Sequence, residues 1–170
     1  LKSVWTLSVT PAGQLVTLSW PRSVSVYSRA GVLESRVNLP HTLNPRHAEL
    51  TASGAFVVSH GYYDADPHAV SLVSRDGVIM ATYGSLPGSG PSHLYSPRDI
   101  VLAAEDRVLV CDRGNRRVLL LDSKLNFRRV LLDLSSFGDD CKPWRLWFDR
   151  RAATLFVGFN TGLVVIYKLN

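Results

Sequence analysis

Arginine and aromatic side chains recur together where short apolar runs of this sequence begin. Arg46 and Arg98 directly follow a proline, and Arg145 follows the pair Pro143-Trp144. A guanidinium group is a planar fork of donors that binds carboxylate or phosphate, while an aromatic ring can stack on a base or pack at a protein interface. The pattern predicts a surface that binds either a protein partner or a single-stranded nucleic acid.

The histidines do not form a recognisable metal or catalytic motif. None of the 5 histidines shows paired ligand spacing such as H-x-x-x-H, and the sequence has no G-x-S-x-G element. A Ser-His-Asp triad stays open, because triads are recognised by geometry rather than by spacing. We therefore expect no metal, no cofactor and no enzymatic activity.

The elements that must position these side chains are β-strands, because helical periodicity is almost absent. Short runs of apolar and β-branched residues, bounded by turn residues, are about five residues long and recur roughly every 8 to 12 residues. They are Val4–Thr10, Gln14–Ser19, Val24–Tyr27, Ala55–Ser59, Ala69–Ser74, Arg107–Cys111, Arg117–Asp122, Thr154–Gly158 and Leu163–Lys168. This spacing predicts an all-β sandwich, barrel or propeller.

Internal repetition favours the propeller among these architectures. Four segments share one plan: a Pro-Arg-like entry, three strands separated by a turn and a polar loop, then an outer strand. They begin about 40 to 50 residues apart, which is the length of a propeller blade. The last segment, Pro143 to Tyr167, lacks the outer strand.

We predict a single all-β domain over residues 1–170. It is a β-propeller of about four four-stranded antiparallel blades, either a partial or a small propeller. The predicted blades cover about 1–40, 41–90, 91–139 and 140–170. The extra length of the second blade falls in the loops His60–His68 and Gly84–Gly90, where insertions cost little.

The third segment resembles an NHL repeat. It reads Ser96-Pro97-Arg98, then the strand Arg107–Asp112, then the loop Arg113–Arg116, then Arg117-Val118. A typical NHL repeat has a Pro-led strand, a strand ending in Ala-Asp, a Gly-Asn loop with a basic residue, and a Val/Ile-rich strand. The fourth segment is similar to the same unit, and the first two are weaker copies, so the resemblance spans nearly the whole chain.

The resemblance implies a recognition module. NHL propellers are commonly six-bladed, and many lie at the C-terminus of tripartite-motif ubiquitin ligases, where they recognise RNA or protein. This chain departs from them in having about four repeats and no RING, B-box, coiled-coil or zinc-binding Cys/His segment. The incomplete count implies a truncated propeller, a small four-bladed ring, or an open half that pairs with another chain.

Charge and composition are consistent with an acidic partner. The chain has 19 Lys and Arg against 14 Asp and Glu, a formal net charge of +5, which favours RNA or an acidic protein surface, although a mildly basic protein without such a partner fits as well.

The cysteines and the lengths of the apolar runs bear on the location of the protein. Two cysteines without C-x-x-C spacing indicate a reducing compartment. No apolar run approaches the roughly 20 residues of a transmembrane helix. We expect a cytoplasmic protein that does not bind membranes.

In a propeller, the loops entering each first strand and the loops joining the second and third strands emerge on one face. We predict that these loops form the binding surface. The candidate residues are Arg22, Arg46, His47, His60, Tyr62, Tyr63, Arg98, Arg113, Asn115, Arg116, Trp144, Arg145 and Asn160.

Structural roles for the same residues stay open. The arginines could bond loop carbonyls or Asp112, and Asp112 with Asn115 could stabilise a turn. Trp5, Trp144 and Trp147 could pack within or between blades.

The function that we expect is a non-catalytic protein-interaction platform. The alternative is single-stranded RNA binding through the Arg- and aromatic-rich face. Self-association that completes a larger propeller is a further expectation.

Overall fold

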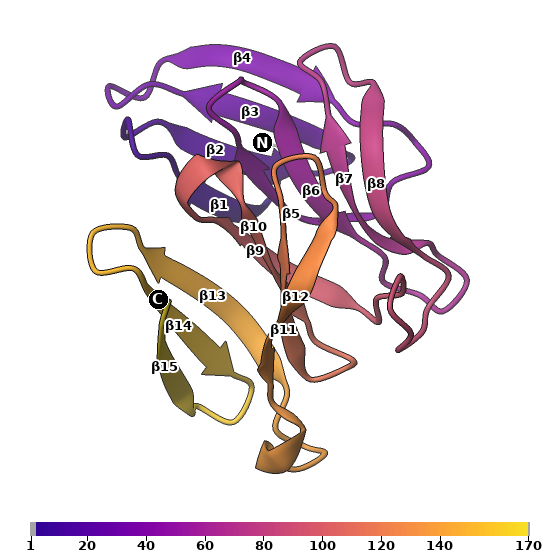
Figure 1. Ribbon diagram of the computed structural model, residues 1–170. Coiled ribbons are helices and arrows are strands. Elements are labelled where there is room, and N and C mark those ends of the chain that lie inside the picture. Colours follow the sequence, from indigo (N-terminus) through magenta and orange to yellow (C-terminus); the bar gives the residue numbers. More distant parts are fainter. Residues whose placement is uncertain (1–2, 170) are drawn as a thin grey trace.

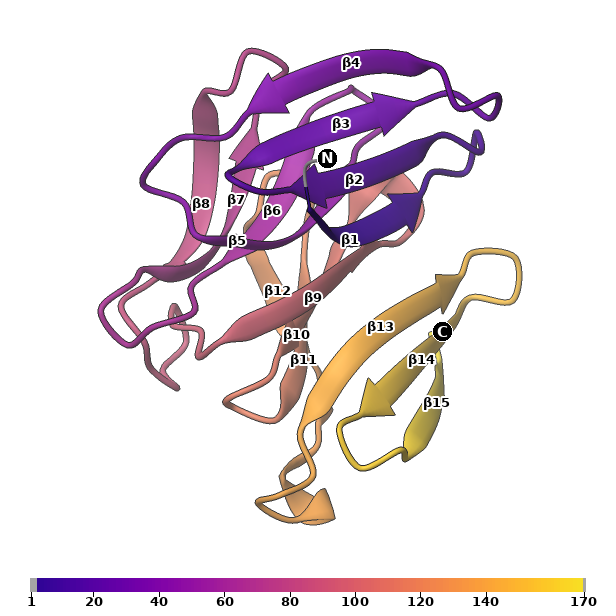
Figure 2. The same ribbon diagram turned by 180° about the vertical axis from the view of Figure 1, so that it is seen from behind.

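The chain folds into four small antiparallel sheets arranged as the blades of a propeller (Figures 1 and 2). The computed structural model describes residues 3–169. Residues 1, 2 and 170, at the ends of the predicted first and fourth blades, lie outside the described residues. The prediction of an all-β, four-bladed propeller-like fold is confirmed.

Each blade pairs its strands in chain order. The strands are β1 (Val4–Val9), β2 (Leu15–Ser19), β3 (Ser23–Tyr27) and β4 (Leu33–Asn38); β5 (Pro45–Leu50), β6 (Phe56–His60), β7 (His68–Val73) and β8 (Ile79–Ser85); β9 (Pro97–Leu102), β10 (Val108–Asp112), β11 (Arg117–Leu121) and β12 (Phe127–Asp133); and β13 (Pro143–Asp149), β14 (Thr154–Phe159) and β15 (Val164–Lys168). Two 3₁₀ turns, η1 (Ala104–Asp106) and η2 (Ser135–Phe137), lie in the connections. The fourth blade therefore has three strands within the described residues.

The turn between the first two strands repeats a tight packing arrangement in blades one and two. Gly13 and Gly54 occupy these turns with φ of +81° and +84°, a region that glycine enters without steric cost. A Cβ on Gly54 would lie 1.9 Å from the Arg75 guanidinium, and one on Gly13 would lie 2.8 Å from Arg29. Both glycines therefore leave room for an arginine that comes from the turn after the third strand.

The core lies between consecutive blades rather than within one of them. One buried cluster joins blades one and two, a second joins blades two and three, and a third joins blades three and four. Successive strand residues point to opposite faces of a sheet, so the almost continuously apolar strands of the middle blades bury both faces. In β10, for example, Leu109 and Cys111 face blade four while Val108 and Val110 face blade two.

The first strands of the blades line the centre of the molecule, and the arc that they form is open. A cavity of about 850 Å³ separates β1 from β13, and residues of β5 and β9 complete its wall. In both ribbon views the yellow fourth blade stands apart from the indigo first blade (Figures 1 and 2). The arc thus has two free ends. These are the face of blade one that points away from blade two and the face of blade four that points away from blade three.

Candidate binding surface

The same irregularity begins the inner strand of every blade. In each case the pairing with the second strand skips one residue: Trp5 between Val4 and Thr6, and Arg46, Arg98 and Trp144 at the equivalent positions. A bulge of this kind leaves its extra residue unpaired and re-aims the side chain. These four residues therefore leave the regular alternation of the sheet at the mouth of the central cavity.

The bulges bring arginines from three blades together. Arg46 and Arg98 line a small cavity of about 170 Å³ with Arg145 of β13 and with Trp5. The Arg98 guanidinium carbon lies 3.4 Å from the centre of the Trp144 ring. Arg113, from the loop between β10 and β11, lies 4.9 Å from the same ring. We call Arg46, Arg98, Arg113 and Arg145 the arginine mouth.

The arginine mouth holds positive charge without internal neutralisation. Within residues 3–169, no carboxylate forms an ion pair with any of its four members. Burial, followed by the charges of Arg46, Arg145 and Arg113, lowers the pKa of Arg98 to about 10, and burial likewise lowers the pKa of Arg46. Arginine side chains carry positive charge at neutral pH, and the mutual repulsion of these neighbouring charges favours a bound anion.

Two donors of the mouth are also unsatisfied. The Nε atoms of Arg98 and Arg113 are buried and find no hydrogen-bond acceptor in the described part of the chain. Leaving such a donor unpaired costs on the order of 1–3 kcal/mol. The unpaired donors therefore lower the stability of the folded protein. Local features that reduce stability in this way are typical of functional sites.

Tyr62 extends the mouth along the loop after β6. The guanidinium carbon of Arg46 lies 4.3 Å from the centre of its ring, and Tyr63 packs edge-on against it with ring centres 4.7 Å apart. Both tyrosine N–H groups donate to Asp66 Oδ2 at 3.1 Å, and Asn44 Nδ2 donates to the same oxygen at 3.0 Å. These hydrogen bonds lower the pKa of Asp66 against the opposing effect of burial, and they fix the loop that presents Tyr62.

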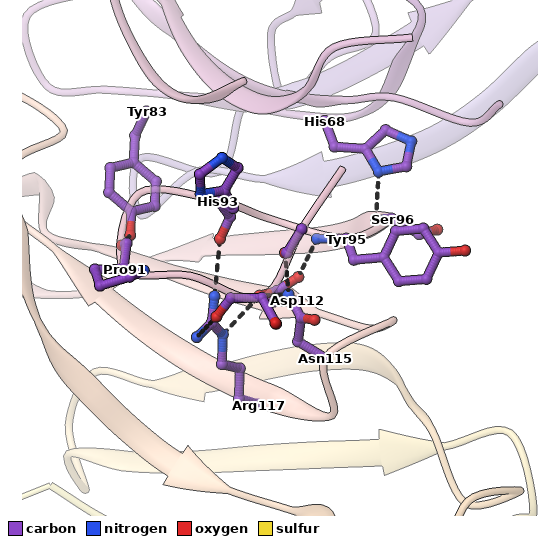
Figure 3. A network of polar contacts seen from close by, with 11 residues as sticks. His68, Tyr83, Pro91, His93, Tyr95, Ser96, Asp112, Asn115 and Arg117 are labelled. Atoms are coloured by element: carbon purple, nitrogen blue, oxygen red, sulfur yellow. Dashed lines mark hydrogen bonds and ion pairs between the residues drawn. The ribbon is translucent and has the colours of Figure 1, made fainter. Parts of the chain in front are cut away.

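A buried carboxylate, Asp112, fixes the long connection that leads into Arg98 (Figure 3). Its Oδ2 accepts hydrogen bonds from Arg117 Nε at 2.7 Å and Asn115 Nδ2 at 2.8 Å, and its Oδ1 accepts one from Tyr95 N–H at 2.7 Å. Arg117 in turn donates to the carbonyl oxygens of Ser89 and His93. The connection between blades two and three is thereby tied to blade three immediately before β9 begins.

The other predicted residues do not join the arginine mouth. Arg22 Nε donates to the Leu43 carbonyl oxygen at 2.7 Å, and Arg116 pairs with Asp139. The Asn115 amide bonds Asp112 and the Gly88 carbonyl oxygen, while Asn160 bridges Lys142 N–H and the Asp140 carbonyl oxygen. These side chains hold loops in shape, which is the structural role that the sequence left open for Asn115.

Two of the predicted histidines are buried. His60 is 3% exposed and contacts Ser71 Oγ at 2.9 Å, and burial lowers its pKa to about 4. His47 lies in the wall of the central cavity, with Nδ1 3.2 Å from Asp99 Oδ1 and Nε2 3.3 Å from Glu49 Oε1. Burial opposes the charged form of His47, but the Glu49 hydrogen bond and the charges of Asp99 and Glu49 outweigh it and raise the pKa.

Trp5 lines the small cavity beside the arginine mouth but is not among the predicted binding residues. The sequence indicates a packing role for Trp5, yet its side chain lines both cavities and is 45% exposed. It packs against Trp20 with ring centres 5.5 Å apart and the ring planes tilted by 36°. The available signal was positional, since Trp5 stands where Arg46, Arg98 and Trp144 stand in the other blades.

Other chemistry is not prominent in the described residues. Residues 3–169 contain no group of three or more His, Cys, Asp and Glu side chains arranged to hold a metal ion. Burial, with the charges of Asp99 and Asp112, raises the pKa of the Cys111 thiol well above its usual value. None of the helices between residues 3 and 169 has the length and apolar character needed to cross a bilayer.

Comparison with known proteins identifies the fold. No protein-family model and no curated protein sequence matches the chain. Among solved structures it is similar to YCF48 bound to D1 peptide (TM-score 0.69, 13% identity, 98% of this chain and 51% of that one) and to the WD40 propeller domain of Doa1 (0.65, 18%, 99% and 51%). Virginiamycin B lyase from Staphylococcus aureus also matches (0.58, 12%, 98% and 55%). The chain therefore has a β-propeller fold and spans about half the length of these propellers.

Proposed function

We propose that this chain is an NHL-type propeller that serves as a non-catalytic protein-interaction platform and binds an acidic segment of a partner at the arginine mouth. The observation that carries the proposal is the convergence of four arginines from three blades, none of which forms an ion pair with a carboxylate of the described residues. Carboxylates of an extended peptide match the planar donor fork of each guanidinium.

The positions of the aromatic rings favour a peptide over single-stranded RNA. RNA binding of this kind uses free ring faces as platforms for bases. Here one face of Trp144 is covered by Arg98, and Arg46 lies over Tyr62. The rings therefore orient guanidinium groups, so the surface that remains for a ligand offers charge and hydrogen-bond donors more than stacking area.

The comparisons add support at the level of the fold. YCF48, a propeller of which this chain covers about half the length, was solved bound to a peptide. The mouth itself contributes only positive charge and aromatic surface, and the buried Cys111 thiol is kept protonated by its raised pKa. These are the groups of a recognition surface rather than of acid–base or nucleophilic chemistry.

Fluorescence anisotropy with labelled oligomers tests the proposal. We expect an Asp/Glu-rich peptide to bind, a Ser/Gly peptide of equal length not to bind, and a random single-stranded RNA pool to bind more weakly at the same ionic strength. Substituting Arg98→Ala, Arg113→Ala and Arg145→Ala together should weaken peptide binding at least about 100-fold.

The control removes arginines from an exposed outer strand. Arg128→Ala with Arg129→Ala on β12 lowers the net charge without touching the mouth and should change affinity less than about threefold. Equal losses for the mouth and control variants would show that only net charge matters. RNA binding that is tighter than peptide binding and is lost in the triple variant would favour the RNA alternative instead.

A further inference from the structure

The two ends of the arc expose faces that resemble the faces buried inside it. Every junction packs the face that one blade turns toward the next, its leading face, against the trailing face of the following blade. Blades two and three bury both faces in this way. The leading face of blade four and the trailing face of blade one have no neighbour among the described residues.

The leading face of blade four is apolar across its width. Trp147, Phe156 and Ile166 are opposite one another on β13, β14 and β15, and Val164 lies in the adjacent row. Trp147 is 58% exposed, Ile166 66% and Val164 56%. Contiguous exposed apolar residues of this kind mark an interaction surface rather than an ordinary solvated face.

The trailing face of blade one carries a matching row. Val9, Leu15, Tyr27 and Leu33 are opposite one another on β1 to β4. Val9 is 64% exposed, and Leu7 in the neighbouring row is 60% exposed. Each end therefore offers one apolar row that crosses all strands of its blade, while the row of Leu7 continues through the polar residues Thr17 and Ser25.

We propose that a second copy of this chain closes the ring, with the leading face of blade four in each copy packed on the trailing face of blade one in the other. The junctions inside one chain already use this leading-on-trailing packing, so two further junctions continue it around the ring. The chain spans 51–55% of the three propellers named above, so two copies together have about the length of one whole propeller, and their eight blades are within the range that propellers adopt.

Closure changes the central cavity and the mouth. A twofold ring presents the same two surfaces on each copy and leaves no free end. The cavity between β1 and β13, which is open in one chain, becomes the interior of the ring. The arginine mouths of the two copies then face a common axis on the same side, which doubles the positive charge offered to an acidic partner.

The mass of the 170-residue chain in solution tests closure. Sedimentation equilibrium or light scattering should give twice the monomer mass of 18.8 kDa. Ile166→Lys on blade four and Leu7→Glu on blade one should each weaken the dimer at least about 10-fold, because each buries a charge at both junctions. Met80→Glu is the matched control, since Met80 is 52% exposed on the outer strand of blade two, and it should leave the mass unchanged.

Mixing the two interface variants separates ring closure from pairing of like faces. In a ring, a heterodimer of the Leu7→Glu chain and the Ile166→Lys chain has one unaltered junction and one in which Glu and Lys meet, so equal mixing should restore the dimer. A wild-type chain that stays monomeric at about 100 µM overturns the proposal. So do species larger than a dimer, which indicate an open filament, and a mixture that remains monomeric.

Discussion

The guanidinium carbon of Arg98 lies over the Trp144 ring, 3.4 Å from its centre, and the two residues occupy the same bulge position in neighbouring blades. A cation over an aromatic face is held electrostatically while its outward N–H groups stay free to bind. The pair therefore presents a preoriented donor fork at the centre of the molecule.

Replacing Arg98 with lysine should reduce peptide affinity even though the charge is kept. A lysine ammonium lacks the planar fork and stacks less well on an indole. We expect about a 10-fold loss for Arg98→Lys, worth roughly 1.4 kcal/mol, measured by anisotropy with the acidic peptide. The control is Arg129→Lys on the outer strand, and equal affinities for the two variants would contradict the bidentate role of Arg98.

Asp112 should be the most sensitive polar residue for stability. Asp112→Asn removes the charge that Arg117 pairs with and places an amide donor among three existing donors. Breaking a buried ion pair on one side costs about 3–5 kcal/mol. Urea unfolding followed by far-UV circular dichroism measures the loss. Asp133→Asn, at an exposed position on β12, should leave the midpoint nearly unchanged, and similar midpoints for both variants would refute the assignment.

His60 should make the protein sensitive to mild acid. Its pKa is about 4 in the folded protein and 6.5 when unfolded, so between these values the unfolded chain binds the extra proton. Stability therefore falls as pH drops from about 6.5 to 4, by about 3 kcal/mol at most. His60→Asn, which keeps a polar partner for Ser71, should flatten this part of the curve, and an unchanged acid slope in that variant would contradict the prediction.

His47 should act in the opposite direction. Because its folded pKa is raised above 6.5, protonated His47 stabilises the fold below about pH 6.5, and the stabilisation is lost as pH rises through the folded value. His47→Gln should therefore cost more near pH 5.5 than at a pH above the folded pKa of His47, where the charged hydrogen bond to Glu49, worth about 1.5–3 kcal/mol, is absent. Equal losses at both pH values would exclude a charged His47.

Strand positions followed directly from the sequence because turn residues and apolar runs alternate. The sequence also predicts three strands without an outer strand in the fourth segment, and that blade has three strands within residues 3–169. The repeat shows that Trp5, Arg46, Arg98 and Trp144 hold equivalent positions, but the bulge that they share could not be predicted, because a bulge depends on which residues of two strands pair.

Histidine environments were equally hidden from the sequence. His60 and His68 flank a polar loop, which made exposure the natural expectation for His60. The structure buries its ring against Ser71 of the neighbouring strand, a contact fixed by β6–β7 register and not by the loop. The environment of a residue is hardest to predict from sequence patterns when it depends on which residues pair across neighbouring strands.

Between Gly88 and His93, the connection between blades two and three is held by hydrogen bonds to its main chain, whereas the Leu94 side chain that follows is fully buried in the core between these blades. Asn115 bonds the Gly88 carbonyl oxygen, Arg117 those of Ser89 and His93, and Tyr83 that of Pro91, while Leu86 in the same stretch is 66% exposed. Since a carbonyl oxygen is common to all amino acids, these hydrogen bonds do not depend on which residues carry it. The segment before the buried Leu94 can consequently accept a foreign recognition sequence more readily than the strands of the scaffold can.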